Sequence, residues 1–331
     1  MKRHLLFLAA LLIVNLAASA QKKFSVYAVG FYNQENLFDT CHDEGKKDYE
    51  YLPNKGWNGM KYTNKLRNMS KALADMGTDV LPNVGCAFIG LSEVENHKVL
   101  DALVDQAPLK ARNMKYVHIE GPDRRGIDCA LLYNPSLFSV KNVKLLPYVQ
   151  ELAKDSAFFT RGFLTVRGEM AGDDVAVIVC HWPSRFSGPF YRESAARQVK
   201  VIKDSLLNVN QEMKIFVMGD MNDDPVNKSM HVYLQAKPEI SQVGAGDMYN
   251  PWYNVLAKEG KGTLFYSGNW NLFDQIVITP NLLNKDAKKK DYSSLKYWKS
   301  HIFRRDYLIQ QEGQYKGAPL RTTAGGRWLN G

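Results

Sequence analysis

The chain has 331 residues, of which 45% are hydrophobic and 23% are charged, which is the composition of a globular protein. Its formal net charge of +9 mildly favours polyanionic partners such as nucleic acid or anionic lipid, although the basic residues are spread along the sequence. Four cysteines in a chain of this length exclude a disulfide framework, and the lack of CxxC and HExxH spacings argues against a structural zinc site.

The first twenty residues are typical of a secretory signal peptide. Lys2 and Arg3 form a basic start, residues 5–16 form an apolar core, and residues 18–20 (ASA) fit a small-residue cleavage site. No cysteine lies at the cleavage point itself, so no lipid anchor is indicated, and no later apolar stretch is long enough to cross a bilayer. We therefore expect residues 1–20 to be removed and the remainder to be exported, periplasmic or secreted, without membrane insertion.

Beyond the signal peptide, the apolar residues alternate between the spacing of strands and the spacing of helices. The pattern predicts strands at residues 25–32, 87–91, 116–119, 127–133, 163–167, 175–180, 215–218 and 272–278. It predicts helices at residues 62–76, 98–107 and 191–207. Residues 175–180 are apolar at every position, so both faces of that strand are expected to be buried. Packed sheets with helices outside are the predicted architecture, in a single domain over residues 21–331.

Polar side chains follow several of the buried strands at the point where each strand ends. In chain order they are Asn33, Glu93, His181, and the pair Asp220 and Asn222. Asp274 differs because it lies near the beginning of the last predicted strand, and an antiparallel strand would bring that beginning to the same edge. Five strands are therefore expected to bring these side chains together on one rim.

This set of side chains is the composition of a magnesium-dependent phosphoester site. Mg²⁺ prefers oxygen ligands and uses one or two carboxylates, leaving its other positions to water and to substrate phosphate. Glu93 suits a direct metal ligand, with Asn33 or Asp274 beside it. We expect Mg²⁺ as the cofactor, with Mn²⁺ as the alternative ion.

The other polar residues suit phosphate binding and water activation. His181 suits a hydrogen bond to a phosphate oxygen, where it stabilises the charged transition state. Asp220 suits orientation or deprotonation of the attacking water, and Asn222 suits fixing the phosphate. Arg161 and the two arginines at 124–125 are interpreted as solvated or structural, and Arg161 is the better candidate for phosphate binding because it begins an apolar strand.

Each of these residues also has a structural interpretation. The stretch VMGDMNDDP (217–225) could be a solvated turn before a helix, because Asp and Asn are favoured both in turns and at helix N-caps. Likewise, Glu93 could lie on the surface, His181 could be a packing histidine, and Asp274 could pair with a nearby cation. Chance explains the joint pattern much less readily than it explains any single member, so the functional interpretation is favoured.

The order of the motifs resembles the endonuclease/exonuclease/phosphatase superfamily, whose fold is that of DNase I. The matching segments run from FYNQENLFD to FDQIVIT, cover most of residues 24–280, and include SEVEN, RRGIDCALLY, CHWPSR and GDMND. GDMN alone is a weak signal, but the ordered combination is strong. The resemblance implies an α+β fold, a four-layer α/β/β/α sandwich with its site at one edge.

The resemblance also implies roles for the matching residues and leaves one motif without a match. The implied roles are metal binding by Glu93 with Asn33 near it, phosphate binding by His181 and Asn222, water activation by Asp220, and support of the site by Asp274. Members of the superfamily normally end with a Ser-Asp-His motif on the last strand, whose His is a principal catalytic residue. The only Ser-His pair here is Ser300-His301, which lacks the Asp. We therefore expect the sequence to stop before the last strand of the family.

The residues and the resemblance together predict an exported, Mg²⁺-dependent phosphodiesterase, with nuclease activity as the leading hypothesis. The first alternative is a phosphatase or a sphingomyelinase-like phosphoesterase, because the fold does not settle the substrate. The second alternative is a catalytically inactive binding protein, which the unmatched Ser-Asp-His motif motivates. The expected partner is nucleic acid or another phosphoester substrate, and the expected oligomeric state is a monomer.

Overall fold

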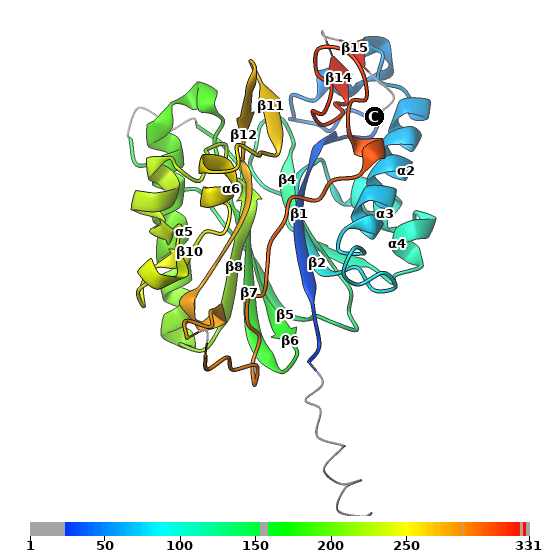
Figure 1. The fold of residues 1–331 in the computed structure, drawn as a ribbon. Coiled ribbons are helices and arrows are strands. Elements are labelled where there is room, and N and C mark those ends of the chain that lie inside the picture. The colour runs from blue at the N-terminus through cyan, green and yellow to red at the C-terminus, as the bar shows by residue number, and fades with distance from the viewer. Residues whose placement is uncertain (1–23, 153–157, 287, 325–326, 329–331) are drawn as a thin grey trace, which may run out of the picture.

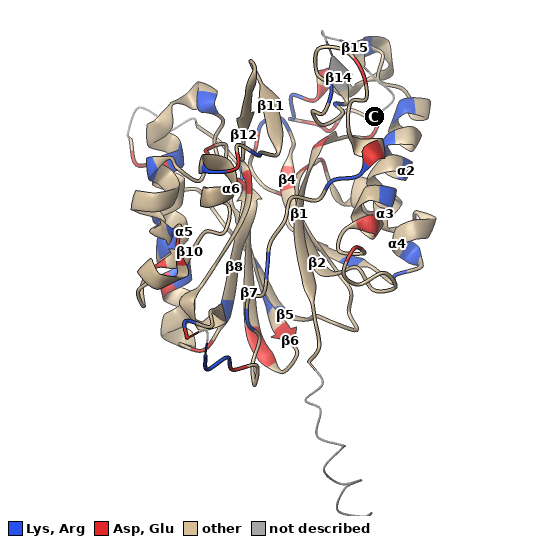
Figure 2. Cartoon of the chain, in the orientation of Figure 1, with Lys and Arg blue, Asp and Glu red and all other residues tan. Residues whose placement is uncertain are grey.

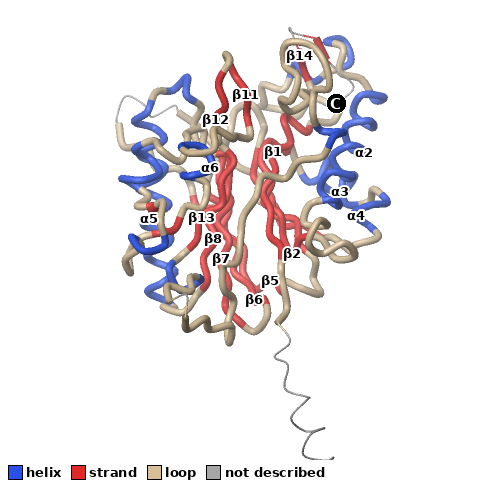
Figure 3. Tube along the Cα trace, in the orientation of Figure 1, coloured by secondary structure: helices blue, strands red, loops and turns tan. Residues whose placement is uncertain are grey.

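The computed structural model describes residues 24–152, 158–286, 288–324 and 327–328. The predicted signal peptide, residues 1–20, lies outside these ranges. Figure 1 shows two β-sheets packed face to face, with helices on the outer face of each. Figure 3 shows the same division, with strands inside and helices outside. The predicted α+β fold with four α/β/β/α layers is confirmed.

The first sheet contains four strands in the order β1-β2-β4-β3. Their bounds are Ala28–Leu37 for β1, Cys86–Val94 for β2, Lys115–His118 for β3 and Asp128–Tyr133 for β4. β1 and β2 are parallel, whereas β4 runs antiparallel to both β2 and β3. Within the described chain β1 pairs only with β2, so its other edge carries no partner strand.

The second sheet contains seven strands in the order β5-β6-β7-β8-β13-β10-β9. Their bounds are Ser139–Leu146 for β5, Phe163–Met170 for β6, Asp173–His181 for β7, Lys214–Asp220 for β8, Ala236–Lys237 for β9, Met248–Tyr249 for β10 and Asp274–Ile278 for β13. β7 and β8 are parallel, and β13 runs antiparallel to β8. This arrangement brings the ends of β7 and β8 to the same edge as the beginning of β13.

Helices cover the two outer faces, and short elements complete the rim. The helices are α2 (Gly59–Asp75), α3 (His97–Val104) and α4 (Ala107–Lys110) on the first sheet, and α5 (Pro189–Val209) and α6 (Tyr253–Ala257) beside the second. The short hairpins are β11 (Leu264–Tyr266) with β12 (Asn269–Asn271), and β14 (Thr323–Ala324) with β15 (Arg327–Trp328). Short helical turns span Tyr49–Tyr51, Pro53–Lys55, Arg185–Ser187, Ser229–Tyr233, Ile240–Gln242, Pro280–Leu282 and Asp306–Leu308. Among the described residues, none of the helices has both the length and the apolar character to span a bilayer.

The apolar strand at 175–180, which is part of β7, packs against a helix on one face and against the first sheet on the other. Side chains alternate across a strand, so Ala176, Ile178 and Cys180 pack with α5, whereas Val175, Val177 and Val179 pack against the first sheet. Phe88 of β2 lies in that same inter-sheet core, with its ring centroid 5.5 Å from that of Phe216. Both faces of the strand are buried, as its sequence predicts.

All eight predicted strands and all three predicted helices are present, with boundaries shifted by a few residues. The helix predicted at 98–107 ends at Val104, because Pro108 lacks the N–H that a continuing helix needs and instead lies in the first turn of α4. The helix predicted at 62–76 begins earlier, at Gly59, because the side chain of Asn58 accepts a hydrogen bond from the Lys61 N–H as an N-cap.

Candidate active site

Three neighbouring strands of the second sheet place three site residues in one row. In the parallel pairing of β7 with β8, His181 lies opposite Asp220. In the antiparallel pairing of β8 with β13, Asp274 lies opposite Asp220. The expectation that an antiparallel strand would bring Asp274 to this edge is therefore confirmed. Figure 2 shows acidic residues at this upper end of β8, whereas many Lys and Arg residues lie on the outer helices.

The first sheet contributes Asn33 and Glu93 to the same place. Asn33 Nδ2 donates a hydrogen bond of 2.9 Å to Asp220 Oδ2, which joins β1 to β8 across the two sheets. Glu93 lies in β2 where the pairing with β4 shifts register, and its φ is 59°. His181 Nε2 lies 3.8 Å from Glu93 Oε1 and 3.9 Å from Asp220 Oδ2. The five strands named by the sequence therefore meet on one rim.

Three aspartates lie at the end of β8 and in the turn that follows it, and two of them form ion pairs with arginines. Asp223 forms an ion pair of 2.8 Å with Arg192, and Asp224 forms one of 2.8 Å with Arg185. Asn222, at φ 49°, donates its backbone N–H to Asp220 Oδ1 and its side-chain amide to the carbonyl of Trp182, each at 2.9 Å. Asp223 and Asp224 thus fix the turn, which leaves Asp220 to face the site.

The charges of the site are not balanced by lysine or arginine. Within the described chain, Glu93, Asp220 and Asp274 form no ion pair with either residue type. Burial, with the charge of Glu93 added, raises the pKa of Asp220 to about 6. Burial, followed by the charge of Asp220, raises the pKa of Asp274 to about 8. Burial lowers the pKa of His181 well below its usual value, and the charges of Arg161 and Arg125 act in the same direction, so the imidazole is neutral.

These donors fit a hydrated divalent cation. Three neighbouring carboxylates repel one another unless a cation or a proton lies between them. No group of three His, Cys, Asp or Glu side chains in the described part of the chain forms a metal cage of its own. Mg²⁺ does not need one, because it keeps several waters and takes one or two carboxylates. The residues that would hold it are Glu93, with the Asn33 amide oxygen or Asp274 beside it.

Arginines approach the site from one side. Arg161 donates from Nη1 to Asp123 at 3.0 Å and from Nη2 to the Trp182 carbonyl at 2.9 Å, so two of its nitrogens already have protein partners. Its role in phosphate binding stays a prediction. Arg125, which the sequence suggested to be solvated or structural, is exposed and donates from Nη2 to Asn36 Oδ1 at 2.5 Å. Its charge reaches His181, so it also borders the site.

A buried lysine near the rim was not recognisable from the sequence. Lys65 of α2 is fully buried and donates its ammonium to the carbonyl of Glu35 and, at 2.8 Å, to Thr322 Oγ1. Glu35 in turn accepts hydrogen bonds from Arg321 Nε and the Thr322 backbone N–H. Glu35 and Asn36 are both left-handed, with φ of 48° and 63°. In the sequence Lys65 is only the neighbour of the predicted core residue Leu66, and the helical pattern does not indicate that Lys65 is buried. Its contacts are seen only in the folded structure.

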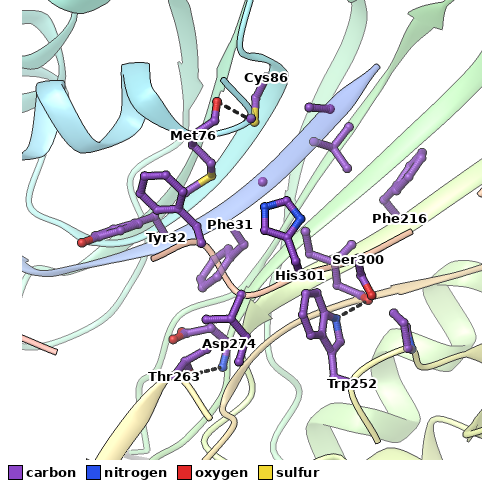
Figure 4. Close-up of a pocket in the computed structure, with 18 of the residues that line it drawn as sticks. Phe31, Tyr32, Met76, Cys86, Phe216, Trp252, Thr263, Asp274, Ser300 and His301 are labelled. Carbon is purple, nitrogen blue, oxygen red and sulfur yellow. Dashed lines mark hydrogen bonds between the residues drawn. The ribbon is translucent and has the colours of Figure 1, made fainter. Parts of the chain in front are cut away.

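A groove of about 1500 Å³ opens between β1 and β13 and reaches the site. Its walls are those two strands and the segment 292–309, which runs between the sheets (Figures 1 and 3). Figure 4 shows Asp274 and Trp252 on one side of this groove, Tyr32 and Met76 on the other, and His301 between them. His301 forms an ion pair of 3.1 Å with Asp79, which is not one of the site residues.

The chain was also compared with known proteins. Residues 28–331 match the model of the endonuclease/exonuclease/phosphatase family. Similar solved structures include ANGEL2, described as a 2′,3′-cyclic phosphatase, at 12% identity and a TM-score of 0.53 over 76% of this chain and 82% of that chain. A mannosyl-6-phosphatase of Bacteroides thetaiotaomicron gives 14% identity and a TM-score of 0.49 over 77% and 86%. TDP2 of D. rerio complexed with a single-strand DNA product gives 12% and 0.46 over 68% and 80%.

At these identities the likeness shows the fold alone. No curated protein matches the chain. The assignment of individual roles to Asn33, Glu93, His181, Asp220 and Asn222 therefore depends on the geometry and chemistry described above.

Proposed function

The chain belongs to the endonuclease/exonuclease/phosphatase family, and on that premise we propose that it is an exported, Mg²⁺-dependent phosphodiesterase that hydrolyses nucleic acid. Family membership supports a phosphoester hydrolase, and the metal, the substrate and the export are parts of the proposal. The observation that carries it is the meeting of Glu93, Asp220 and Asp274 beside a neutral His181, where none of the three carboxylates pairs with a lysine or arginine of the described residues.

The surroundings of Asp220 support a role in activating the attacking water. Its two carboxylate oxygens accept hydrogen bonds of 2.9 Å from the Asn222 backbone N–H and from Asn33 Nδ2, which fix its orientation. A pKa of about 6 leaves this carboxylate ionised at neutral pH but basic enough to accept a proton. Asp220 therefore takes the proton of the water that attacks phosphorus.

The surroundings of His181 and Asn222 support a role in holding the phosphate. With its proton on Nε2, the neutral imidazole of His181 donates a hydrogen bond to a phosphate oxygen, where negative charge grows in the transition state. Asn222 is locked by its contacts to Asp220 and Trp182, so its position relative to the phosphate is set before substrate binds. Mg²⁺ held by Glu93 supplies charge neutralisation of the phosphate oxygens when it is bound.

Nucleic acid is preferred over a small phosphate ester because of the charge and the shape of the surroundings. The formal net charge of +9, which becomes +7 when residues 1–20 with Lys2 and Arg3 are removed, favours a polyanion. The charge of the exposed Arg125 also acts on His181, in a site that opens onto the groove. Export rests on the signal-peptide pattern in residues 1–20, and the monomeric state stays a prediction from the sequence.

The test is hydrolysis of plasmid DNA, RNA and bis-p-nitrophenyl phosphate by protein produced from the complete gene. We expect nucleic acid to be cleaved with Mg²⁺, and cleavage to be lost with EDTA and in Glu93→Ala and Asp220→Ala. Asp105→Ala, which removes an exposed carboxylate paired with Lys110 on the outer helices, is the matched control and should remain active. Turnover of the small ester alone would favour the phosphatase class, and no turnover of any substrate would contradict the proposal.

A further inference from the structure

Phe186 is an exposed phenylalanine in a short turn that follows the strand of His181, and arginines hold this turn in place. Phe186 is fully exposed to solvent, at the apex of the helical turn Arg185–Ser187. This turn follows His181 by only four residues, and the intervening Trp182 carbonyl accepts the hydrogen bond from Asn222 Nδ2. A single exposed apolar residue is ordinary on a protein surface, so its support rather than its exposure is informative.

Two arginines clamp the turn that carries Phe186. The buried Arg192 donates from Nη1 to the carbonyls of Ser184 and Gly188, at 3.0 Å each, on the two flanks of the turn. Arg192 is itself fixed by its ion pair with Asp223. Buried, charge-assisted hydrogen bonds therefore hold the backbone of the turn, so Phe186 keeps its place on the surface although its fully exposed side chain can rotate.

Arg185 connects the same turn to the turn that follows β8. Its Nε donates to the carbonyl of Asn222 at 3.2 Å, its Nη2 donates to Asp224 Oδ2 at 2.8 Å, and its guanidinium lies 4.4 Å from the ring centre of Phe273. With these contacts made, Arg185 serves to hold the turn and not to bind substrate. Phe186 is thus carried by a fixed stretch of backbone next to the turn that follows Asp220 and contains Asn222.

We propose that Phe186 is a stacking platform for an unpaired nucleobase beside the scissile phosphodiester, so that single-stranded nucleic acid is the preferred substrate. This inference rests on the proposed function and names its substrate class. Base–aromatic stacking needs an open base face, which a single strand offers along its length and a duplex offers only at its ends. Because the backbone of the turn is already fixed, it needs no further ordering when a base stacks on the ring.

The surroundings of Phe186 favour a base over a lipid surface. Its neighbours along the chain, Ser184, Arg185 and Ser187, are polar, which suits contact with a nucleotide better than insertion into a membrane. A second exposed ring, Phe159, lies under Arg124, whose guanidinium carbon is 5.0 Å from the ring centre. Arginine–aromatic pairs of this kind are typical of surfaces that bind single strands.

The test is the binding of a fluorescent eight-nucleotide deoxyadenosine strand, measured by anisotropy in an Asp220→Asn background that blocks cleavage. A series of strands in which one base at a time is removed, leaving the phosphates, reports which base is stacked. Phe186→Ala should weaken binding of the intact strand about 5- to 100-fold, the range for loss of one stacked base. It should change little for the strand that lacks that base.

Three further variants make the result specific. Phe186→Trp should retain binding, because it keeps an aromatic face, whereas Phe186→Leu should behave like Phe186→Ala. Tyr315→Ala, which removes an exposed ring on the C-terminal segment, is the matched control and should bind like the parent protein. Equal binding by the Phe186→Ala variant and the parent, or no binding of any strand, would overturn the inference. Full binding by Phe186→Leu, together with Phe186-dependent binding to anionic phosphatidylglycerol vesicles, would also overturn it in favour of a membrane contact.

The proposed function has a separate readout. Hydrolysis of bis-p-nitrophenyl phosphate by otherwise wild-type protein tests the catalytic site, and the control variant Tyr315→Ala should leave its kcat unchanged. If the wild-type protein hydrolyses no substrate but its strand binding depends on Phe186, the proposed function is contradicted and the stacking role is supported. If it hydrolyses nucleic acid and the Phe186 variants bind strands as the parent does, the proposed function is supported and the stacking role is contradicted.

Discussion

At the scale of single residues, the site depends on backbone that side-chain bonds hold in place. Glu35, Asn36, Glu93 and Asn222 all have positive φ, which costs a non-glycine residue about 1–3 kcal/mol. Such conformations persist only where the surroundings enforce them. At Glu35 the enforcing contact comes from Lys65, whose buried ammonium bonds to the Glu35 carbonyl.

Lys65→Met should therefore reduce activity more than stability. Removing a buried ammonium relieves a desolvation cost, which offsets the lost bonds to Glu35 and Thr322, so the free energy of unfolding should change by less than about 2 kcal/mol. The left-handed turn at Glu35 and Asn36, whose Asn36 side chain accepts a hydrogen bond from Arg125, loses its bond to Lys65. We therefore expect kcat to fall about tenfold or more. Thermal unfolding and steady-state kinetics on the same preparation measure both quantities.

Lys203→Met is the matched control, because Lys203 is also fully buried but bonds to Asp204 and the Gly246 carbonyl beside α5. It should keep the wild-type kcat. A Lys65→Met variant with wild-type kcat would show that the turn needs no such anchor.

A second prediction at this scale concerns the pH dependence of stability. Glu95 is buried, and Oε1 finds no hydrogen-bond partner within the described chain. Burial raises its pKa from 4.5 to about 8, and the charges of Asp39, Asp43 and Asp48 act in the same direction. Between these values the folded state binds more protons than the unfolded state, so the contribution of Glu95 to stability falls as the pH rises from about 4.5 to about 8.

Glu95→Gln stays neutral at every pH and should lose this dependence. With EDTA present throughout, its melting temperature relative to wild type should be higher at pH 8.5 than at pH 5. An equal difference at the two pH values would mean that Glu95 is not held in its protonated form.

At the scale of elements, the close approach of β7 and β8 aligns His181 with Asp220. A Cβ at Gly219 would lie 2.2 Å from the Cys180 carbonyl oxygen and 2.8 Å from its carbonyl carbon. Backbone atoms cannot move away as a flexible side chain can, so any side chain at 219 forces the two strands apart.

Gly219→Ala should accordingly destabilise the protein by about 1–3 kcal/mol, as overpacking typically does, and abolish most of its activity. Gly246→Ala is the control, because no heavy atom lies within 4 Å of its added Cβ. Chemical unfolding together with a hydrolysis assay distinguishes the two variants. Near-normal activity in Gly219→Ala would show that the row of His181, Asp220 and Asp274 tolerates displacement.

The sequence predicts elements better than it predicts their irregularities. Strands with unbroken apolar runs, such as the one ending at His181, are evident because both of their faces are buried. β5 was missed, since this edge strand alternates exposed lysines with half-buried positions and bulges between Val140 and Asn142. The sequence likewise does not indicate the bulge at Glu93, because this bulge is a shift in the pairing of β2 with β4 and no local residue pattern marks it.

The same limit applies to the partners of the site residues. Polar residues at strand ends identify Asn33, Glu93 and Asp220 without a structure. The contacts of Lys65 and Arg125 depend on segments 30 and 89 positions away in sequence, which periodicity cannot register.

At the scale of the whole molecule, the site exists only because the two sheets are packed together. Asn33 and Glu93 belong to the first sheet, whereas His181, Asp220 and Asp274 belong to the second. The shared core that contains Phe88 and Phe216 sets their separation, and the Asn33–Asp220 hydrogen bond closes the seam. Catalysis is therefore expected to require contributions from both sheets at once.

The most direct measurement of this claim is Mg²⁺-dependent hydrolysis of bis-p-nitrophenyl phosphate by Glu93→Gln, His181→Ala and Asp220→Asn, one variant from each of three strands. Each side chain contacts the same reacting group in this account, so each variant should lose at least about a hundredfold in kcat while keeping the wild-type melting temperature. EDTA should abolish the wild-type rate. A folded variant of any of the three that retains the wild-type rate, or a wild-type rate that survives EDTA, would contradict a single metal-dependent site shared by both sheets.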